Sequence, residues 1–143
     1  MKKLWLFCLI TATVAFASCS KDNDNSENQT GRIIGKWEVY QYVEERNGTL
    51  HNEYYGSALN DIWTYEFRND GSGVETENYL YNDRWNSFED PFTYSVSGNS
   101  LRIKYVDDGE SYIYSIEELT STKLVLINKT DGSYSDILYL QRY

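Results

Sequence analysis

The feature that most constrains this chain is an apolar–polar alternation of period two that recurs between residues 33 and 143. In its first occurrence Trp37, Val39 and Val43 fall on one face of an extended segment. Successive side chains of a β-strand point to opposite faces, so this pattern predicts strands with one buried face. The same region carries no apolar stripe of helical period and comparable length. We therefore expect an all-β domain.

Turn signals divide this region into about eight segments. Asn69-Asp70-Gly71, Gly98-Asn99 and Asp107-Asp108-Gly109 interrupt the alternation with residues that favour tight turns. The stretch 47–59 has the weakest pattern and is either a short edge strand or a loop. The predicted strands are 37–43, 63–67, 74–81, 92–97, 101–105, 112–116, 124–126 and 138–142.

Eight sequential antiparallel strands have two common arrangements, a closed up-and-down barrel and a two-sheet β-sandwich. Closure of the sheet removes exposed strand edges. A barrel of this size encloses an interior that holds either packed side chains or one small ligand. We therefore expect an eight-stranded antiparallel barrel, with the sandwich as the alternative.

Residues 1–18 have the three parts of a secretory signal peptide. Lys2 and Lys3 supply the positive start, an apolar run follows over residues 4–16, and the small pair Ala17-Ser18 comes last. A transmembrane helix needs about 20 apolar residues, which is more than this run contains. We therefore expect cleavage after Ser18.

Phe16-Ala17-Ser18-Cys19 resembles the lipobox of bacterial lipoproteins, with Phe16 where Leu or Val is usual. Because Cys8 lies in the leader, Cys19 would be the only thiol of the mature chain. Exported domains that use disulfides carry an even set of cysteines in their body, which is not the case here. The resemblance implies that Cys19 carries acyl chains that hold the protein on a membrane. A free thiol is the alternative.

The stretch Ser20–Thr30 contains no apolar side chain, so we predict a flexible polar tether over residues 19–32 and a β domain over 33–143. Its acidic start, Lys21–Asp24, is similar to the signal that sends lipoproteins of one Gram-negative group to the outer face of the outer membrane. This similarity implies a surface-exposed outer-membrane lipoprotein, with the inner face as the alternative. The tether lacks the Gly and Glu spacing of an EF-hand, so we expect no metal.

Several blocks of the β domain resemble a known family. Gly35-Lys36-Trp37 resembles the Gly-x-Trp motif that opens the first strand of lipocalins. The blocks Phe67–Gly73, Tyr94–Ile103 and Tyr114–Leu126 are similar to strand–turn–strand blocks of small bacterial lipocalin-like lipoproteins. The similarity spans residues 33–143 and implies a barrel.

In lipocalins the tryptophan of this motif closes one end of the barrel, and an arginine late in the chain packs across it. The resemblance therefore assigns Gly35, Trp37 and Arg142 a structural role, with a cation–π contact between Trp37 and Arg142. The alternative is that Arg142 is simply solvated. A guanidinium more than about 6 Å from the ring would exclude the contact.

Charge and motifs restrict the possible functions. The formal net charge of −9 becomes −11 once Lys2 and Lys3 are removed, which disfavours nucleic-acid partners. His51 is the only histidine and is expected in a surface loop. The chain has no Gly-x-Ser-x-Gly elbow, phosphate-binding glycine loop or His/Cys metal cluster. Carboxylates such as Glu75 and Glu77 are interpreted as solvated strand faces. We expect a non-enzymatic protein without a cofactor.

Aromatic residues favour a binding role. The β domain holds three tryptophans and all fourteen tyrosines of the chain. A tyrosine offers an apolar ring with a polar hydroxyl, which suits a partly solvated pocket. We predict a monomer that binds a small apolar or amphipathic molecule. The alternative is an interaction or structural protein with a filled core and a protein or glycan partner. The candidate ligand-binding residues are Trp63, Tyr65, Tyr79, Tyr81, Trp85 and Tyr94.

Overall fold

The computed structural model describes residues 25–56 and 61–143. The predicted signal peptide, Cys19 and the start of the tether lie outside these residues. Within the described part no helix is long and apolar enough to cross a membrane. The elements of that part are one helix and nine strands: α1 (Asn25–Ile33), β1 (Gly35–Arg46), β2 (Thr49–Tyr55), β3 (Asp61–Phe67), β4 (Ser72–Tyr81), β5 (Arg84–Ser97), β6 (Ser100–Tyr105), β7 (Ser111–Leu119), β8 (Lys123–Asp131) and β9 (Tyr134–Arg142).

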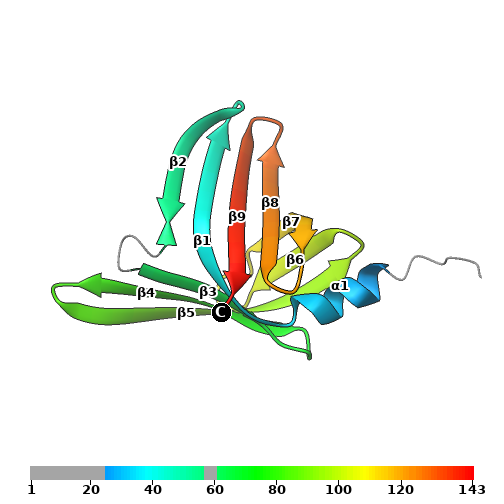
Figure 1. The fold of residues 1–143 in the computed structure, drawn as a ribbon, viewed down its shortest axis with the longest axis horizontal. Helices are drawn as coiled ribbons and strands as arrows, with labels where there is room; N and C mark the ends of the chain where they lie inside the picture. The colour runs from blue at the N-terminus through cyan, green and yellow to red at the C-terminus, as the bar shows by residue number, and fades with distance from the viewer. Residues whose placement is uncertain (1–24, 57–60) are drawn as a thin grey trace, which may run out of the picture.

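The strands form a closed antiparallel barrel of eight members with β2 as an extra strand (Figure 1). Strand β1 closes the ring, because it pairs with β9 along almost its whole length and with β3 over residues 35–38. The other strands pair with their neighbours in chain order. The closed ring confirms the predicted barrel and excludes the sandwich.

All eight predicted strands are present, and the weak stretch 47–59 contributes the ninth. Strand β2 pairs with the second half of β1 through a two-residue turn at Asn47 and Gly48. Both turn residues have positive φ, which matches the right-handed twist of the strands they join. His51 therefore lies on an edge strand, not in the expected loop, and its imidazole is 3.8 Å from the carboxylate of Glu44.

Strands β4 and β5 form a long hairpin that runs away from the rest of the barrel (Figure 1). Its turn at Asn82 and Asp83 has positive φ at both residues, as a two-residue hairpin turn requires. β6 pairs with β5 only from Phe92 onward, so the first half of β5 pairs with β4 alone. The predicted strand begins at residue 92, because residues 84–91 lack the apolar alternation of a strand with one buried face; in the structure both of their faces are largely exposed.

Residues 25–32, which are part of the predicted tether, form most of α1 in the structure. The helix is held by polar contacts to the barrel, and such contacts leave no apolar pattern in the sequence. The amide of Gln29 donates to the side chain of Asn99 at 3.0 Å, and the guanidinium of Arg32 donates to the carbonyl of Leu119. Ile33 at the end of the helix is fully buried in the core.

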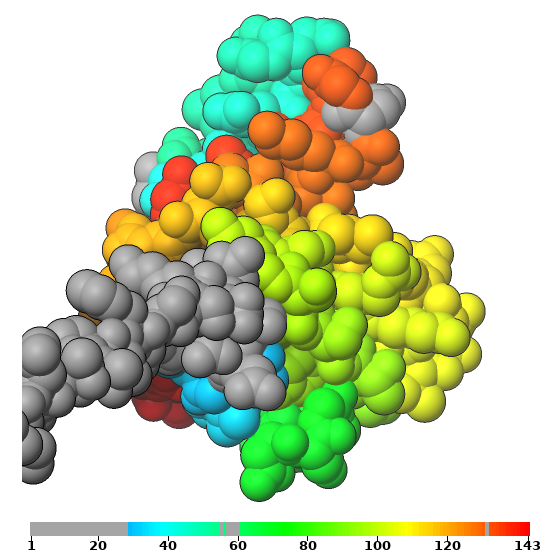
Figure 2. Space-filling view, turned by 90° about the vertical axis from the view of Figure 1, so that its right-hand side faces the viewer, coloured from blue at the N-terminus to red at the C-terminus, as the bar shows by residue number. Residues whose placement is uncertain are grey.

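The core fills the end of the barrel next to α1. Its buried side chains come from α1 and from every strand of the ring except β4, since alternate residues of these strands point inward. Gly73 on β4 makes this packing possible, because a Cβ there would lie 2.2 Å from the ring of Phe92. Figure 2 views the molecule from the side of α1 and shows the β1–β2 and β8–β9 hairpins standing above the body formed by late β5, β6 and β7.

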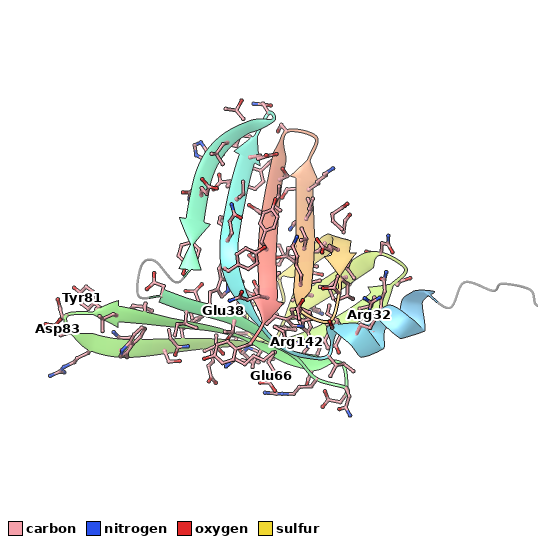
Figure 3. The ribbon with its side chains drawn as sticks, in the orientation of Figure 1. Arg32, Glu38, Glu66, Tyr81, Asp83 and Arg142 are labelled. Carbon is pink, nitrogen blue, oxygen red and sulfur yellow. The ribbon has the colours of Figure 1, made fainter. Side chains whose placement is uncertain are left out.

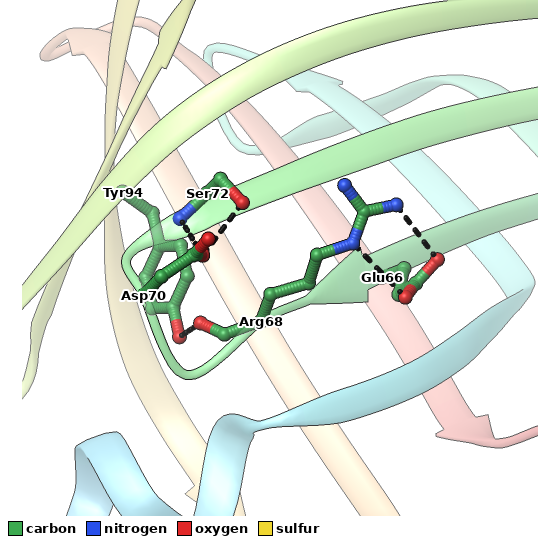
Figure 4. Close-up of polar contacts among 5 residues, drawn as sticks. All are labelled: Glu66, Arg68, Asp70, Ser72 and Tyr94. Carbon is green, nitrogen blue, oxygen red and sulfur yellow. Dashed lines mark hydrogen bonds and ion pairs between the residues drawn. The ribbon is translucent and has the colours of Figure 1, made fainter.

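The turn between β3 and β4 completes this closed end (Figure 4). The carboxylate of Asp70 accepts hydrogen bonds from the backbone N–H and the hydroxyl of Ser72, at 2.9 and 2.6 Å. The hydroxyl of Tyr94 donates to the carbonyl of Arg68 at 2.6 Å, which ties the turn to β5. These bonds fix the loop that follows β3.

Candidate functional site

The two ends of the barrel differ in the chemistry of their inward-facing residues. On β6 the inward residues change from Leu101 and Ile103 to Tyr105, and on β9 they change from Leu138 to Asp136. Both changes occur on the side away from α1. The α1 end is therefore a filled apolar core, and the opposite end is lined by aromatic rings and carboxylates.

A cavity of about 320 Å³ lies in this second end, and we call it the inner cavity. Six aromatic rings and five carboxylates surround it. Its lining consists of Tyr42, Trp63, Tyr65, Glu75, Asp90, Tyr105, Asp108, Glu110, Tyr112, Tyr114, Asp136 and Leu138. The volume is of the size that a small-molecule site requires, about 300 Å³ or more.

A second cavity of about 560 Å³, the mouth cavity, adjoins the first and shares Tyr42 and Trp63 with it. It exists because β1 pairs with β3 only as far as Glu38 and then with β2 from Gln41 onward. Strands β1 and β3 thus separate toward the open end. The lining consists of Tyr42, Asn52, Tyr54, Asp61, Ile62, Trp63, Glu77, Asn78, Tyr79 and Leu80.

Tyrosine hydroxyls in the inner cavity donate hydrogen bonds to its carboxylates. Tyr42 donates to Asp136 at 2.6 Å and Tyr112 donates to Glu110 at 2.5 Å. Glu75 accepts on both oxygens, from the indole N–H of Trp63 at 2.6 Å and from the hydroxyl of Tyr105.

Burial shifts the titration of this network. It raises the pKa of the Glu75 carboxyl, and the hydrogen bonds from Tyr105 and Trp63 oppose that shift. Burial also raises the pKa of Tyr105, with the negative charge of Glu75 as the next cause. The hydrogen bond to Glu110 raises the pKa of Tyr112 to about 12. Tyr105 and Tyr112 therefore stay protonated at neutral pH, and each donates a hydrogen bond to a carboxylate.

The predicted ligand-binding residues are divided between four places. Trp63 and Tyr65 line the inner cavity, and Tyr79 lines the mouth cavity together with Trp63. Tyr81 and Trp85 line neither cavity; they lie at the far end of the β4–β5 hairpin, where Figure 3 labels Tyr81.

Tyr94 was expected in the site, but its side chain lies in the closed core, where its ring packs 5.0 Å from that of Phe67. It lines neither cavity. The alternation of β5 alone does not show which end of the barrel an inward residue reaches, and this is why sequence analysis misplaced Tyr94.

Sequence analysis missed Tyr42, Tyr105, Tyr112 and the carboxylates of the inner cavity. Glu75, interpreted as part of a solvated strand face, is largely buried and hydrogen-bonded. The signal that identifies these residues is a polar or tyrosine side chain at an inward position near the same end of several strands. Within the described chain no group of three or more His, Cys, Asp or Glu side chains is arranged to hold a metal ion.

At the closed end Arg142 packs over Trp37 as the resemblance implies. Its guanidinium carbon lies 3.8 Å from the centroid of the Trp37 ring. Its nitrogens donate to the carbonyls of Ile34 at 2.8 Å and Arg32 at 3.0 Å, while the indole of Trp37 donates to Ile33 at 2.7 Å. These carbonyls end α1, so the pair also caps the helix. Figure 3 shows Arg32 and Arg142 together at this end.

Gly35 has a specific role in this arrangement. Its φ is +123°, and a Cβ at this position would lie 2.4 Å from a guanidinium nitrogen of Arg142. The glycine of the Gly-x-Trp motif therefore provides the space in which the arginine crosses the tryptophan.

An eight-stranded antiparallel barrel with one filled end and one end that bears a cavity is a β-barrel of the lipocalin type. The family model of the lipocalin-like domain matches residues 33–126, so the chain belongs to the lipocalin-like domain family.

Solved structures show the same fold. A lipocalin-like protein from Bacteroides uniformis superposes with a TM-score of 0.55 at 19% identity, covering 79% of this chain and 100% of its own. An uncharacterized protein from Bacteroides eggerthii has a TM-score of 0.54 at 15% identity, covering 77% of this chain and 98% of its own. Comparison with curated proteins gives no match.

Proposed function

We propose that this protein is a non-enzymatic binding protein that holds a small apolar or amphipathic molecule at the open end of its barrel. The observation that carries the proposal is the pair of adjoining cavities at one end of a barrel whose other end is filled. Lipocalins hold one small ligand inside an eight-stranded barrel, which agrees with this use of the fold.

Two tryptophan variants test the proposal against its alternative. Trp63 lines both cavities, whereas Trp85 lies outside them with 57% of its surface exposed. We expect Trp63→Ala to weaken binding of the neutral fluorescent probe N-phenyl-1-naphthylamine, and Trp85→Ala to leave it unchanged. Equal binding by both variants and the wild type would contradict a ligand site in the barrel.

The alternative function, recognition of a protein or glycan partner, has its support on the β4–β5 hairpin. Tyr81, Trp85 and Phe88 are exposed there, and exposed aromatic side chains are common at interaction sites. If probe binding is lost in Trp85→Ala and kept in Trp63→Ala, the hairpin and not the cavity is the binding surface.

We further propose that the protein is exported, lipidated on Cys19 and held at the outer membrane with the barrel on the cell surface. The support is the leader of residues 1–18, the lipobox-like segment and the acidic run that follows it. In a bacterial host, Cys19→Ala should abolish incorporation of labelled palmitate and release the protein from membranes. Palmitate incorporation that persists in this variant would contradict lipidation. A wild-type protein that incorporates palmitate but is not labelled from outside on intact cells would contradict only the surface location.

A further inference from the structure

Four hydrogen bonds of the inner cavity run in the same direction, from an aromatic side chain to a carboxylate. Tyr42, Tyr105 and Tyr112 each donate their hydroxyl proton to a carboxylate, and the indole of Trp63 does the same. A phenol whose hydroxyl already donates to a carboxylate can only accept a further hydrogen bond, and an ionised carboxylate can only accept hydrogen bonds. These hydrogen-bonded groups therefore offer a ligand acceptor atoms and aromatic faces.

The charge of the two cavities has one sign. Five carboxylates line the inner cavity, and Asp61 and Glu77 line the mouth cavity. Among the described residues, no Lys, Arg or His lines either one. Basic residues of the neighbouring strand β6, such as Arg102 and Lys104, alternate with buried Leu101 and Ile103 and so lie on its exposed face. Among the described residues, no cationic side chain of the two linings therefore balances the negative charge of these carboxylates.

The aromatic rings surround the same space. Trp63 lies 5.9 Å from the ring of Tyr42 and 6.4 Å from that of Tyr54, both in edge-to-face geometry. On the opposite wall Tyr105 and Tyr112 are 5.8 Å apart, again edge to face. Rings set at such angles present faces in several directions, and the negative face of an aromatic ring attracts an organic cation.

We propose that the ligand is an amphipathic organic cation, an inference that rests on the binding function proposed above. Its ammonium or amidinium group lies in the inner cavity against Asp136, Glu75 and the surrounding rings, and its apolar body extends into the mouth cavity beside Ile62, Tyr79 and Leu80. A fatty acid or another anion is disfavoured, because its charge would lie among carboxylates and no Lys, Arg or His side chain of the described linings would compensate it.

Three ligands of equal chain length and different charge test this inference by isothermal titration calorimetry: octylamine, 1-octanol and octanoate. At pH 7 and low salt we expect octylamine to bind about tenfold or more tightly than octanoate, with octanol between them. Added salt should weaken the binding of octylamine and leave that of octanol unchanged. Octanol binding also reports that a variant remains folded.

Two variants with the same change of charge locate the effect. Asp136→Asn keeps the size of a side chain in the inner cavity, whereas Glu117→Gln alters an exposed residue of β7 outside it. Asp136→Asn should reduce the affinity for octylamine about fivefold or more and leave the affinity for octanol unchanged. Glu117→Gln should leave both affinities unchanged. Glu75→Gln serves as a second test if Asp136→Asn no longer binds octanol.

The outcomes separate the two proposals. Binding of octanol or octanoate at least as tight as that of octylamine would overturn the cationic ligand and retain a ligand site. A preference for octylamine that neither cavity variant reduces would overturn its placement in the inner cavity. Absence of binding by all three ligands, together with failure of the neutral probe, would contradict the binding function itself.

Discussion

Replacement of Arg142 by methionine tests how the closed end of the barrel is held together. Methionine keeps an apolar stem over the Trp37 ring and removes the charge and the donors. The lost cation–π contact, on a ring that is fully buried, contributes about 1–2 kcal/mol. The bond to the partly buried carbonyl of Ile34 contributes about 1.5 kcal/mol as a charged hydrogen bond.

The remaining bonds of Arg142, to the exposed carbonyls of Arg32 and Ser121, contribute little because water can replace them. The loss of unfolding free energy should therefore be about 3 kcal/mol, or about 10 °C in melting temperature for a domain of this size. Urea titration followed by tryptophan fluorescence measures it.

The matched control for this experiment is Arg102→Met on the exposed face of β6, which should change stability by less than about 0.5 kcal/mol. If Arg142→Met and Arg102→Met have equal effects, Arg142 is merely solvated and the account of the closed end is refuted.

Three further variants have expected outcomes. Gly73→Ala places a Cβ 2.2 Å from the ring of Phe92 and should lower the free energy of unfolding by about 1–3 kcal/mol or more in urea titration. Gly31→Ala, whose Cβ would meet no neighbouring atom within 4 Å, should not destabilise the protein, and equal effects of the two variants would contradict the tight packing at β4. Burial raises the pKa of Glu75, so the folded protein retains this proton to higher pH than the unfolded chain. Relative to Glu75→Gln, the free energy of unfolding of the wild type should be highest below the ordinary pKa of 4.5 and should fall as pH rises through the folded-state pKa. A difference that does not depend on pH would contradict the burial of the carboxyl. In Glu110→Gln the pKa of Tyr112, about 12, should return toward the ordinary value of 10, as measured by the tyrosinate absorbance. An unchanged titration would exclude the hydrogen bond to Glu110 as the cause of the raised pKa.

Much of the fold is predictable from the sequence because most strands of the barrel have one solvent-exposed face and one buried face. The alternation of Leu101, Ile103 and Tyr105, bounded by turn residues, predicts β6 within one residue. The first half of β5 lacks this signal, because both faces of the hairpin are exposed there. Helix α1 also lacks it, since its anchoring partners, such as Asn99 and Leu119, are remote in sequence.

The site is less predictable than the fold. Trp63 and Tyr65 could be identified because aromatic residues on an inward face suit a pocket, whatever their depth in the barrel. Glu75 and Asp136 could not be identified, because a carboxylate in an alternating strand usually marks the solvated face. Only the register of the closed ring shows that these two face inward and meet the tyrosines.

The most direct test of the proposed function observes the indole N–H signals of the three domain tryptophans by NMR during titration with octylamine, or with octanol if the amine does not bind. The N–H of Trp63 donates to Glu75 in the inner cavity, that of Trp37 donates to Ile33 in the closed core, and Trp85 lies outside both cavities. We predict that the signal of Trp63 shifts with ligand concentration while those of Trp37 and Trp85 remain in place. A Trp63 signal that stays fixed while the signal of Trp85 shifts would contradict a ligand site in the barrel.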